Sequence, residues 1–284
     1  AAVELHTFVS VFQDQAVNAQ LAPDKEAERD LLPAPHELAN KLLLADRGYP
    51  CLDYFEQVMA AGGYFLMRST ANLNPKVCCV HGPGGRLPRF EGYRLQETLR
   101  WLPRRRLDLD VEWDRPQGRT LRLRIVLVWT PHKKQFMVLV TNVSRKVLTA
   151  RQVAEVYRLR WQIELVFKEW KSHANLHAFA SANPALVEGL IWASLCAAAL
   201  KRSLAHASQR TGGDVAISTM VTAMCGAHIL HDLLRCALEG FHGLEPILER
   251  VFRYLCNNAA RAHPARDRTT GRLRFGLEYV GVKA

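Results

Sequence analysis

The sequence YRLRWQIELVFKEWK, at residues 157–171, carries the pattern from which we interpret the rest of the chain. Just upstream, Thr149 and Gln152 have the spacing of a helix capping box, so we predict one long helix over residues 150–172. Apolar residues recur every three or four positions along it, as on the buried face of an amphipathic helix: Val156, Leu159, Ile163, Phe167 and Trp170. The helix should therefore pack against the protein through that face.

A narrow polar stripe lies at the edge of the apolar face. At about 100° per residue, four side chains fall within about 60° of one another: Tyr157, Arg160, Glu164 and Lys171. One interpretation is a solvated surface on which Arg160 and Glu164 form an i,i+4 pair worth about 0.3 kcal/mol. The other is a functional site in which Glu164 binds a metal ion, because the neighbouring arginine and lysine are suited to nucleic-acid phosphates.

The overall composition favours a globular protein with a polyanionic partner. Of the 284 residues, 49% are hydrophobic, which allows a substantial core and excludes wholesale disorder. Lys and Arg number 38 against 27 Asp and Glu, giving a formal net charge of +11. Such an excess favours binding to nucleic acid or to an acidic membrane surface.

The sequence argues against a membrane protein and against a disulfide-rich one. The longest apolar run, residues 185–200, contains Glu188 and is too short to span a bilayer unaided. No secretory signal opens the sequence. The seven cysteines are odd in number and lack a C-x-x-C pair, which argues against a disulfide scaffold or a zinc module. We therefore expect a cytoplasmic protein with no membrane partner.

The pattern of apolar residues and turn formers changes along the chain. A first segment alternates strands and helices, and its compact apolar strand at residues 42–45 is followed directly by Asp46. A β-rich segment, a segment with the long helix, a helical region and a basic, mobile tail follow. The five segments are expected at residues 1–74, 75–142, 143–182, 183–258 and 259–284. Further helices are predicted at residues 33–40, 52–61, 184–208, 215–238 and 244–257.

Two motifs resemble those of a known family. The four stripe residues are spaced as in the Y-R-E-K signature of DDE transposases from bacterial insertion sequences, of the insertion-sequence-four type. The sequence DRGY at residues 46–49, which follows an apolar strand, resembles the second acidic motif of that family. The resemblance covers about residues 1–200 and has its motifs in the family's order.

The resemblance implies a mixed α/β fold with a ribonuclease-H-like catalytic core. An all-β insertion would interrupt this core, and a helical C-terminal region would follow it. In the family, three carboxylates from distant segments hold two Mg²⁺ ions, for which Mn²⁺ can substitute. Asp46 and Glu164 would be two of these catalytic metal ligands. Two ions held by oxygen ligands can stabilise both the attacking and the leaving oxygen of a phosphoryl transfer.

The resemblance also assigns contacts to DNA. Four residues would bind phosphates near the cleaved end: Tyr157, Arg160, Lys171 and Arg47. In the β-rich segment, Trp101 lies beside Arg104 and Arg105 and is the candidate for stacking on a base, which is worth about 1–3 kcal/mol. Trp113 and Trp129 fit better on the face of the sheet.

The activity implied is that of a transposase, which cleaves double-stranded DNA at the ends of an element and joins the ends to target DNA. A homodimer on DNA is part of the same expectation. The family's first aspartate has no match, since Asp14 lies in a turn and Asp24 and Asp30 lie in a polar connection. We therefore expect an incomplete copy that begins downstream of that aspartate. The alternatives are a catalytically inactive DNA-binding remnant and a related nuclease without strand transfer.

Other clusters of polar residues are weaker candidates. Asp108 and Asp110 face one side of a strand and could bind a cation, but the arginines of residues 121–125 on the partner strand favour ion pairing. His173 and His177 have the i,i+4 spacing of zinc ligands, but without an H-E-x-x-H motif zinc is the less favoured interpretation. Two further motifs are expected to be structural, namely Cys78-Cys79 in the core of a strand and the glycine-rich turn at residues 82–85.

Overall fold

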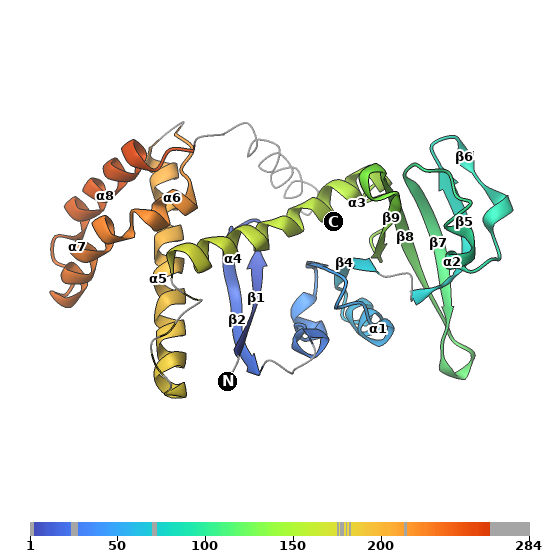
Figure 1. Ribbon diagram of the computed structural model, residues 1–284, viewed down its shortest axis with the longest axis horizontal. Helices are drawn as coiled ribbons and strands as arrows, with labels where there is room; N and C mark the ends of the chain where they lie inside the picture. Colours follow the sequence, from blue (N-terminus) through green and yellow to red (C-terminus); the bar gives the residue numbers. More distant parts are fainter. Residues whose placement is uncertain are drawn as a thin grey trace. The chain divides into compact units, whose positions relative to one another are not determined.

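The computed structural model describes residues 3–23, 28–69, 73–174, 176, 179, 181, 183–212 and 215–261 (Figure 1). These residues form two compact units. Of the described residues, the first unit holds 3–6 and 20–160, and the second holds 7–19 and 161–261. Asp24, His177 and nearly all of the expected basic tail lie outside the described residues. The mixed α/β class is confirmed, whereas the ribonuclease-H-like arrangement and the five-segment division stay predictions.

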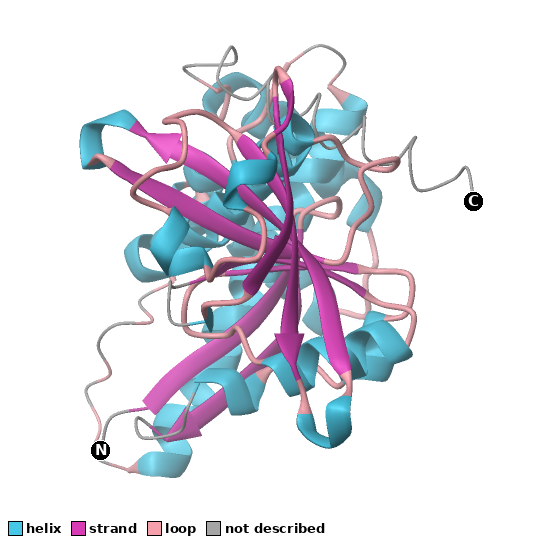
Figure 2. Cartoon of the chain, turned by 90° about the vertical axis from the view of Figure 1, so that its right-hand side faces the viewer, coloured by secondary structure: helices cyan, strands magenta, loops and turns pink. Residues whose placement is uncertain are grey.

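A seven-stranded sheet is the centre of the first unit (Figure 2, magenta). Its strands, in spatial order, are β3 (Leu42–Ala45), β4 (Tyr64–Ser69), β9 (Gln135–Thr141), β8 (Thr120–Thr130), β7 (Leu107–Asp114), β5 (Lys76–Gly82) and β6 (Gly85–Arg86). Only β3 and β4 run parallel; the other neighbours are antiparallel. The central strands are nearly continuous apolar runs, and Ile125, Leu127 and Leu139 are fully buried. Strands buried on both faces have this composition.

The predicted buried strand and helix around Asp46 are confirmed. Strand β3, helix α1 (Leu52–Ala60) and strand β4 form a parallel crossover, in which Phe55 of α1 stacks on Phe65 of β4 at 4.2 Å between ring centroids. The helix ends at Gly62, whose φ of +72° is left-handed, as is common for glycine after a helix. The helix expected at residues 33–40 is only a 3₁₀ turn, η2 (Pro35–Leu38). This crossover places Asp46 at the carboxyl end of β3.

Short elements connect the longer strands. The Cys78-Cys79 pair lies in strand β5 as expected, but both cysteines are half-buried rather than in the core. The glycine-rich turn joins β5 to β6. The short helical elements of this unit are η1 (Glu28–Leu31), η4 (Pro88–Phe90), α2 (Leu95–Thr98), η5 (Pro116–Gly118) and η6 (Pro131–Lys133). The hairpin of β7 and β8 has the predicted acidic and basic strands, with Asp110 opposite Arg124 and Glu112 opposite Arg122.

The long helix predicted over residues 150–172 is not uniform. It consists of α3 (Ala150–Tyr157), the 3₁₀ turn η7 (Arg158–Arg160) and α4 (Trp161–His173). The predicted capping box is confirmed, because Gln152 N donates to Thr149 Oγ1 at 3.3 Å and Thr149 N donates to Gln152 Oε1 at 2.9 Å. The 3₁₀ turn winds about 120° per residue rather than 100°. The angular positions calculated for the polar stripe therefore do not hold through η7.

The second unit is mostly helical. It contains the tip of the hairpin formed by β1 (Val3–Ser10) and β2 (Gln15–Pro23), followed by α4, α5 (Pro184–Thr211), α6 (Thr219–Met224), α7 (Gly226–Leu238) and α8 (Leu244–Asn258). The helix expected at residues 215–238 is in fact two helices that meet at Cys225. The apolar core of this unit comprises Leu204, Ala205, Ile217, Ile229, Val251, Leu255 and Ala259.

Helix α5 is longer than its apolar run. At 28 residues, it is long and apolar enough to cross a bilayer by length and composition, so the argument from the short run 185–200 was insufficient. Its Arg202, however, is buried in an ion cluster, with Nη1 donating to Glu169 Oε2 at 2.8 Å and Nη2 lying 3.0 Å from Asp14 Oδ1. Burial raises the pKa of Glu169. A buried arginine paired with two carboxylates is typical of a core helix, and the absence of a membrane partner stays a prediction.

Candidate functional site

Asp46 lies at the point where β3 ends and a turn begins. Leu43 and Ala45 of β3 are buried, and the backbone turns directly after Asp46, whose carbonyl oxygen accepts a hydrogen bond from Tyr49 N at 3.5 Å. The Asp46 side chain is 41% exposed. A carboxylate on a rigid strand end, half open to solvent, is available to a ligand while its backbone is held in place.

Three polar side chains surround the Asp46 carboxylate. Tyr157 Oη donates a hydrogen bond to Asp46 Oδ1 at 3.3 Å. Arg68 Nη1 lies 3.9 Å from Oδ1, and Arg160 Nη1 lies 3.9 Å from Oδ2. Both arginine distances exceed the range of a direct hydrogen bond. One carboxylate therefore faces two guanidinium groups and a phenol, with a surplus of one positive charge, and we name these four residues the Asp46 cluster.

Helix α3 positions Tyr157. Val153 and Val156 on the same helix are buried, and they hold the tyrosine at 6% exposure next to the strand end. Burial raises the pKa of Tyr157, and the negative charge of Asp46 raises it further. The phenol thus stays protonated at neutral pH and acts as a hydrogen-bond donor.

Sequence reasoning missed Arg68, although a signal for it exists. In the parallel ladder, Ala45 is paired with Met67, so the next residue of β4 lies beside Asp46 at the carboxyl end of both strands. Arg68 is the charged residue that ends the apolar run Phe65–Met67. Its Nε is buried and has no hydrogen-bond partner among the described residues. A half-buried guanidinium with an unsatisfied donor is suited to binding an anion.

The structure places the predicted site residues in different units. Asp46, Tyr157 and Arg160 come together in the first unit. Glu164, which is half-buried in the first turn of α4, and the exposed Lys171 at the end of α4 belong to the second unit. That Asp46 and Glu164 converge on a common metal pair stays a prediction.

The expected DNA contacts of the β-rich segment are on its surface. Trp101 follows α2 and is 70% exposed, and Arg47, Arg104 and Arg105 are also exposed. The guanidinium of Arg104 lies over the ring of Trp129, 5.3 Å from its centroid. In addition, Trp113 is 5% exposed, as expected for a residue of the sheet face. An exposed aromatic followed closely in the sequence by Arg104 and Arg105 has the composition of a nucleic-acid surface.

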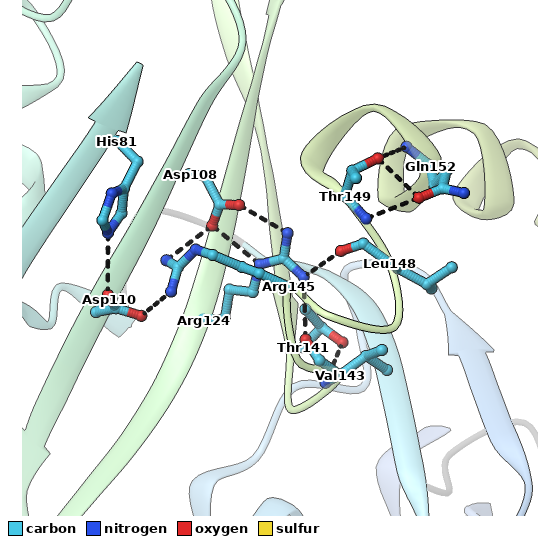
Figure 3. Close-up of polar contacts among 10 residues, drawn as sticks. All are labelled: His81, Asp108, Asp110, Arg124, Thr141, Val143, Arg145, Leu148, Thr149 and Gln152. Carbon is cyan, nitrogen blue, oxygen red and sulfur yellow. Dashed lines mark hydrogen bonds and ion pairs between the residues drawn. The ribbon is translucent and has the colours of Figure 1, made fainter. Parts of the chain in front are cut away.

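Asp108, by contrast, is used for ion pairing rather than for cation binding (Figure 3). Arg124 Nε and Nη2 donate to its two oxygens at 2.9 and 2.7 Å, and Arg145 Nη2 lies 2.9 Å from Oδ1. Arg124 Nη1 also donates to the carbonyl oxygens of Val143 and Leu148 at 3.0 and 2.7 Å. We name Asp108, Arg124 and Arg145 the Asp108 cluster; the ion pair between Asp108 and an arginine of the partner strand is the one that the sequence predicted.

The donor set of the Asp46 cluster fits a divalent metal ion only in part. The carboxylate offers two hard oxygens of the kind that Mg²⁺ prefers. Two ions need more than one carboxylate, and each oxygen of Asp46 already has an arginine nitrogen 3.9 Å away. A further carboxylate would have to complete the site. The positive surplus around Asp46 is suited to phosphate oxygens.

Comparison with known proteins gives a consistent result. Residues 1–200 match the family model described as the transposase DDE domain. The chain is 42% identical over 77 residues to the transposase of insertion sequence element IS421 from Escherichia coli, a match that covers 27% of this chain and 21% of the relative. It is 61% identical over 33 residues to the transposase of IS1151 from Clostridium perfringens, a match that covers 12% of this chain and 7% of the relative. It is 25% identical over 155 residues to the transposase of IS231D from Bacillus thuringiensis, a match that covers 51% of this chain and 31% of the relative. The chain thus matches about a fifth to a third of the length of the longer-matching relatives.

Proposed function

Because this chain belongs to the family of transposase DDE domains, we propose that it acts in DNA transposition through metal-dependent cleavage and strand transfer at the ends of an insertion sequence. The observation that carries this proposal is the Asp46 cluster, in which a strand-end carboxylate lies among two guanidinium groups and a protonated phenol. Its partners are proposed to be double-stranded DNA at the element ends and at the target. A homodimer on DNA is part of the proposal.

The metal site is proposed to use Asp46 from the first unit and Glu164 from the second within a ribonuclease-H-like core. Mg²⁺, or Mn²⁺ in its place, would stabilise the charge of the attacking and leaving oxygens. The protein's own contribution is to hold the scissile phosphate. Arg68 and Arg160 would pair with its non-bridging oxygens, and Tyr157 would fix the orientation of the Asp46 carboxylate through its hydrogen bond.

DNA outside the reacting phosphate is proposed to bind on two further surfaces. Lys171 and Arg47 are exposed and would contact backbone phosphates. Trp101, with Arg104 and Arg105, would hold a base and its flanking phosphates on the β-rich segment. Base stacking tolerates any sequence, because every base has a π face. This surface would therefore supply affinity rather than recognition of particular bases.

The decisive experiment measures cleavage and DNA binding separately in one pair of variants. The full chain is incubated with labelled duplexes taken from the DNA that flanks its gene, in the presence of Mg²⁺. We expect Glu164→Gln to lose cleavage and strand transfer but to retain DNA affinity, because the amide keeps the shape and removes the metal-binding charge. The matched control is Glu155→Gln on α3, since the Glu155 carboxylate pairs with exposed Arg151 at 2.9 Å.

Three results would contradict the proposal. Equal cleavage by the wild type and by Glu164→Gln would exclude Glu164 as a metal ligand. Salt-sensitive DNA binding without cleavage, even on duplexes already nicked at the element end, would instead support the inactive DNA-binding remnant. Cleavage without any joined product would support the nuclease alternative.

A further inference from the structure

A second group of potential metal ligands lies at the other end of the seven-stranded sheet. Cys79 and His81 of β5 and Asp110 of β7 each offer one ligand atom, and these atoms lie within 4.8 Å of one another. His81 Nε2 is 3.4 Å from Asp110 Oδ2. All three residues are half-buried, so they are partly shielded from water yet accessible to an ion. The group is separate from the Asp46 cluster and does not depend on the proposed function.

A β-bulge brings the three residues together. On a regular strand, consecutive side chains such as Cys78 and Cys79 point to opposite faces. The register between β5 and β7 shifts between Val77 and Cys79, so that Val77 is opposite Val111 but Cys79 is opposite Asp110. His81, two residues after Cys79, shares its face. Bulges commonly redirect a side chain in this way.

The surroundings hold the carboxylate in place. Arg145 Nη1 donates to Asp110 Oδ1 at 2.7 Å, while the other oxygen faces His81 (Figure 3). Metal-binding carboxylates and histidines are usually oriented by such outer hydrogen bonds. Burial raises the pKa of the Cys79 thiol, the nearby Glu91 is among the groups that raise it further, and Arg86 anchors Glu91 through two hydrogen bonds at 2.7 and 2.6 Å. A further oxygen donor is therefore next to the group.

We propose that Cys79, His81 and Asp110 bind a zinc ion, with a fourth position left for water or for Glu91. A thiolate, an imidazole and a carboxylate are the three ligand types found at zinc sites in proteins. Zinc bonds of about 2.0–2.3 Å place tetrahedral ligand atoms roughly 3.5 Å apart. His81 Nε2 and Asp110 Oδ2 already have this spacing at 3.4 Å, and the longest separation in the group, at most 4.8 Å, would have to shorten by about 1 Å. Mg²⁺ is a poor alternative, because it takes oxygen ligands. The ion would fasten β5 and the two-residue strand β6 to β7 at the edge of the sheet.

Cobalt titration of the full chain tests this proposal. Co²⁺ replaces zinc and absorbs strongly in the near ultraviolet only when a thiolate is bound to it. Excess Mg²⁺ is added to occupy sites made of carboxylates alone, so that these sites take up little of the Co²⁺. The near-ultraviolet absorption then measures the Co²⁺ that is bound to a cysteine. The wild-type chain should reach saturation at one Co²⁺ per chain, and added Zn²⁺ should displace it.

Matched variants then identify the ligands. Cys79→Ser should abolish the thiolate absorption, whereas Cys78→Ser, which changes the adjacent cysteine beside Glu112, should retain it. Loss of a residue that only hydrogen-bonds to a metal ligand weakens metal binding by about 10–100-fold. His81→Ala and Asp110→Asn each remove a proposed ligand, so they should weaken Co²⁺ binding by more than this. Asp46→Asn should leave the absorption unchanged, which separates this site from the proposed catalytic one.

Three outcomes would overturn the proposal. These are no thiolate absorption in the wild-type chain, equal absorption after Cys79→Ser, or a loss on Cys78→Ser as large as on Cys79→Ser. Far-ultraviolet circular dichroism of each variant shows whether it is folded. If Cys79→Ser does not fold, the site is tested instead by chemical modification of the thiols of the folded wild-type chain. Zn²⁺ should then protect Cys79 and not Cys78 from alkylation, and equal protection or none would count against the site.

Discussion

The Asp46 cluster and the Asp108 cluster use the same chemistry in opposite ways. Both combine an aspartate with two arginines, and both lie in the first unit. In the Asp108 cluster, the nitrogen–oxygen distances from the two arginines to the carboxylate are 2.7–2.9 Å. In the Asp46 cluster, the corresponding distances are 3.9 Å and the aspartate side chain is 41% exposed. Residue types alone therefore do not separate a structural cluster from one that can bind a ligand.

The two clusters differ in how many of the hydrogen-bonding groups on their charged side chains already have close partners. Asp108 and Arg124 are buried, and a buried charge is tolerated only when it is paired and hydrogen-bonded. Arg124 donates to both oxygens of Asp108 and to two backbone carbonyls, so this pair has used its hydrogen-bonding capacity. Asp46 keeps contact with solvent and meets its arginines only at long range. An incoming phosphate or metal ion could thus bind there without breaking a short ion pair.

Removing the Asp46 carboxylate should reduce DNA cleavage and leave the fold intact. We expect Asp46→Asn to slow DNA cleavage by about a thousandfold or more, because several kcal/mol of charge stabilisation by a metal are lost. Its free energy of unfolding should change by less than about 1 kcal/mol, as is usual for exposed pairs. Cleavage rates, Mn²⁺ binding and urea denaturation measure the three quantities.

Asp53→Asn, which removes an exposed carboxylate on α1, is the matched control and should cleave normally. If Asp46→Asn binds Mn²⁺ and cleaves DNA as the wild type does, the Asp46 cluster is not the catalytic site.

Removing the Asp108 carboxylate should, in contrast, destabilise the fold. Asp108→Asn leaves the buried Arg124 guanidinium uncompensated, so we expect a loss of about 3–5 kcal/mol in the free energy of unfolding. Urea denaturation measures this loss. Asp114→Asn on the same strand, whose side chain is 83% exposed, should change stability by less than about 1 kcal/mol. Similar stabilities for the two variants would mean that the Asp108 cluster contributes little to the fold.

Substitution of Arg68, which was not predicted from the sequence, tests whether the excess positive charge around Asp46 contributes to DNA binding. Arg68→Gln should reduce DNA affinity about tenfold at low salt, because a charge-assisted phosphate contact is lost. The slope of log affinity against log salt should also fall by about one. Binding titrations at several salt concentrations measure both. Arg122→Gln, an exposed arginine of the same sheet paired with Glu112 at 3.4 Å, is the control, and an equal slope change there would remove the special role of Arg68.

Tyr157 should show the smallest effect. Tyr157→Phe removes one hydrogen bond to Asp46, so the free energy of unfolding should fall by about 1 kcal/mol or less. Because burial and Asp46 raise the pKa of Tyr157, its phenolate should form only above the ordinary value of 10. Ultraviolet titration of wild-type and variant chains should therefore differ only above pH 10. A difference that appears below pH 10 would contradict the buried, protonated phenol.

Local sequence patterns predicted the elements around both clusters. The apolar run before Asp46, the Thr149–Gln152 capping box and the acidic and basic strands of the β7–β8 hairpin are all present. Each depends on residues close in sequence or on a simple alternation. Predictions that assumed uniform geometry were wrong, as at the 3₁₀ turn η7 and at the helix break at Cys225. Local propensity does not resolve such interruptions, because packing decides them.

The contacts of Arg68 and of the Cys79 group could not be predicted in the same way. Arg68 meets Asp46 through the parallel register of β3 and β4, and Cys79 meets Asp110 through a β-bulge. A shift of one residue in either ladder would turn these side chains to the other face. The C-x-x-C spacing reports only on ligands close together in the sequence, so it does not test a group such as Cys79, His81 and Asp110, which comes from two strands.

The amino-acid sequence by itself determined the family, the mixed α/β class and the residue types available at each strand end and helix face. Spacing along one chain segment conveys this information, because periodicity and capping act over a few residues. Only the tertiary structure decided which carboxylate is saturated and which stays open. That outcome depends on strand register and on a difference of little more than an ångström in the distances between groups far apart in the chain, because a hydrogen bond at 2.7 Å and a contact at 3.9 Å have different consequences.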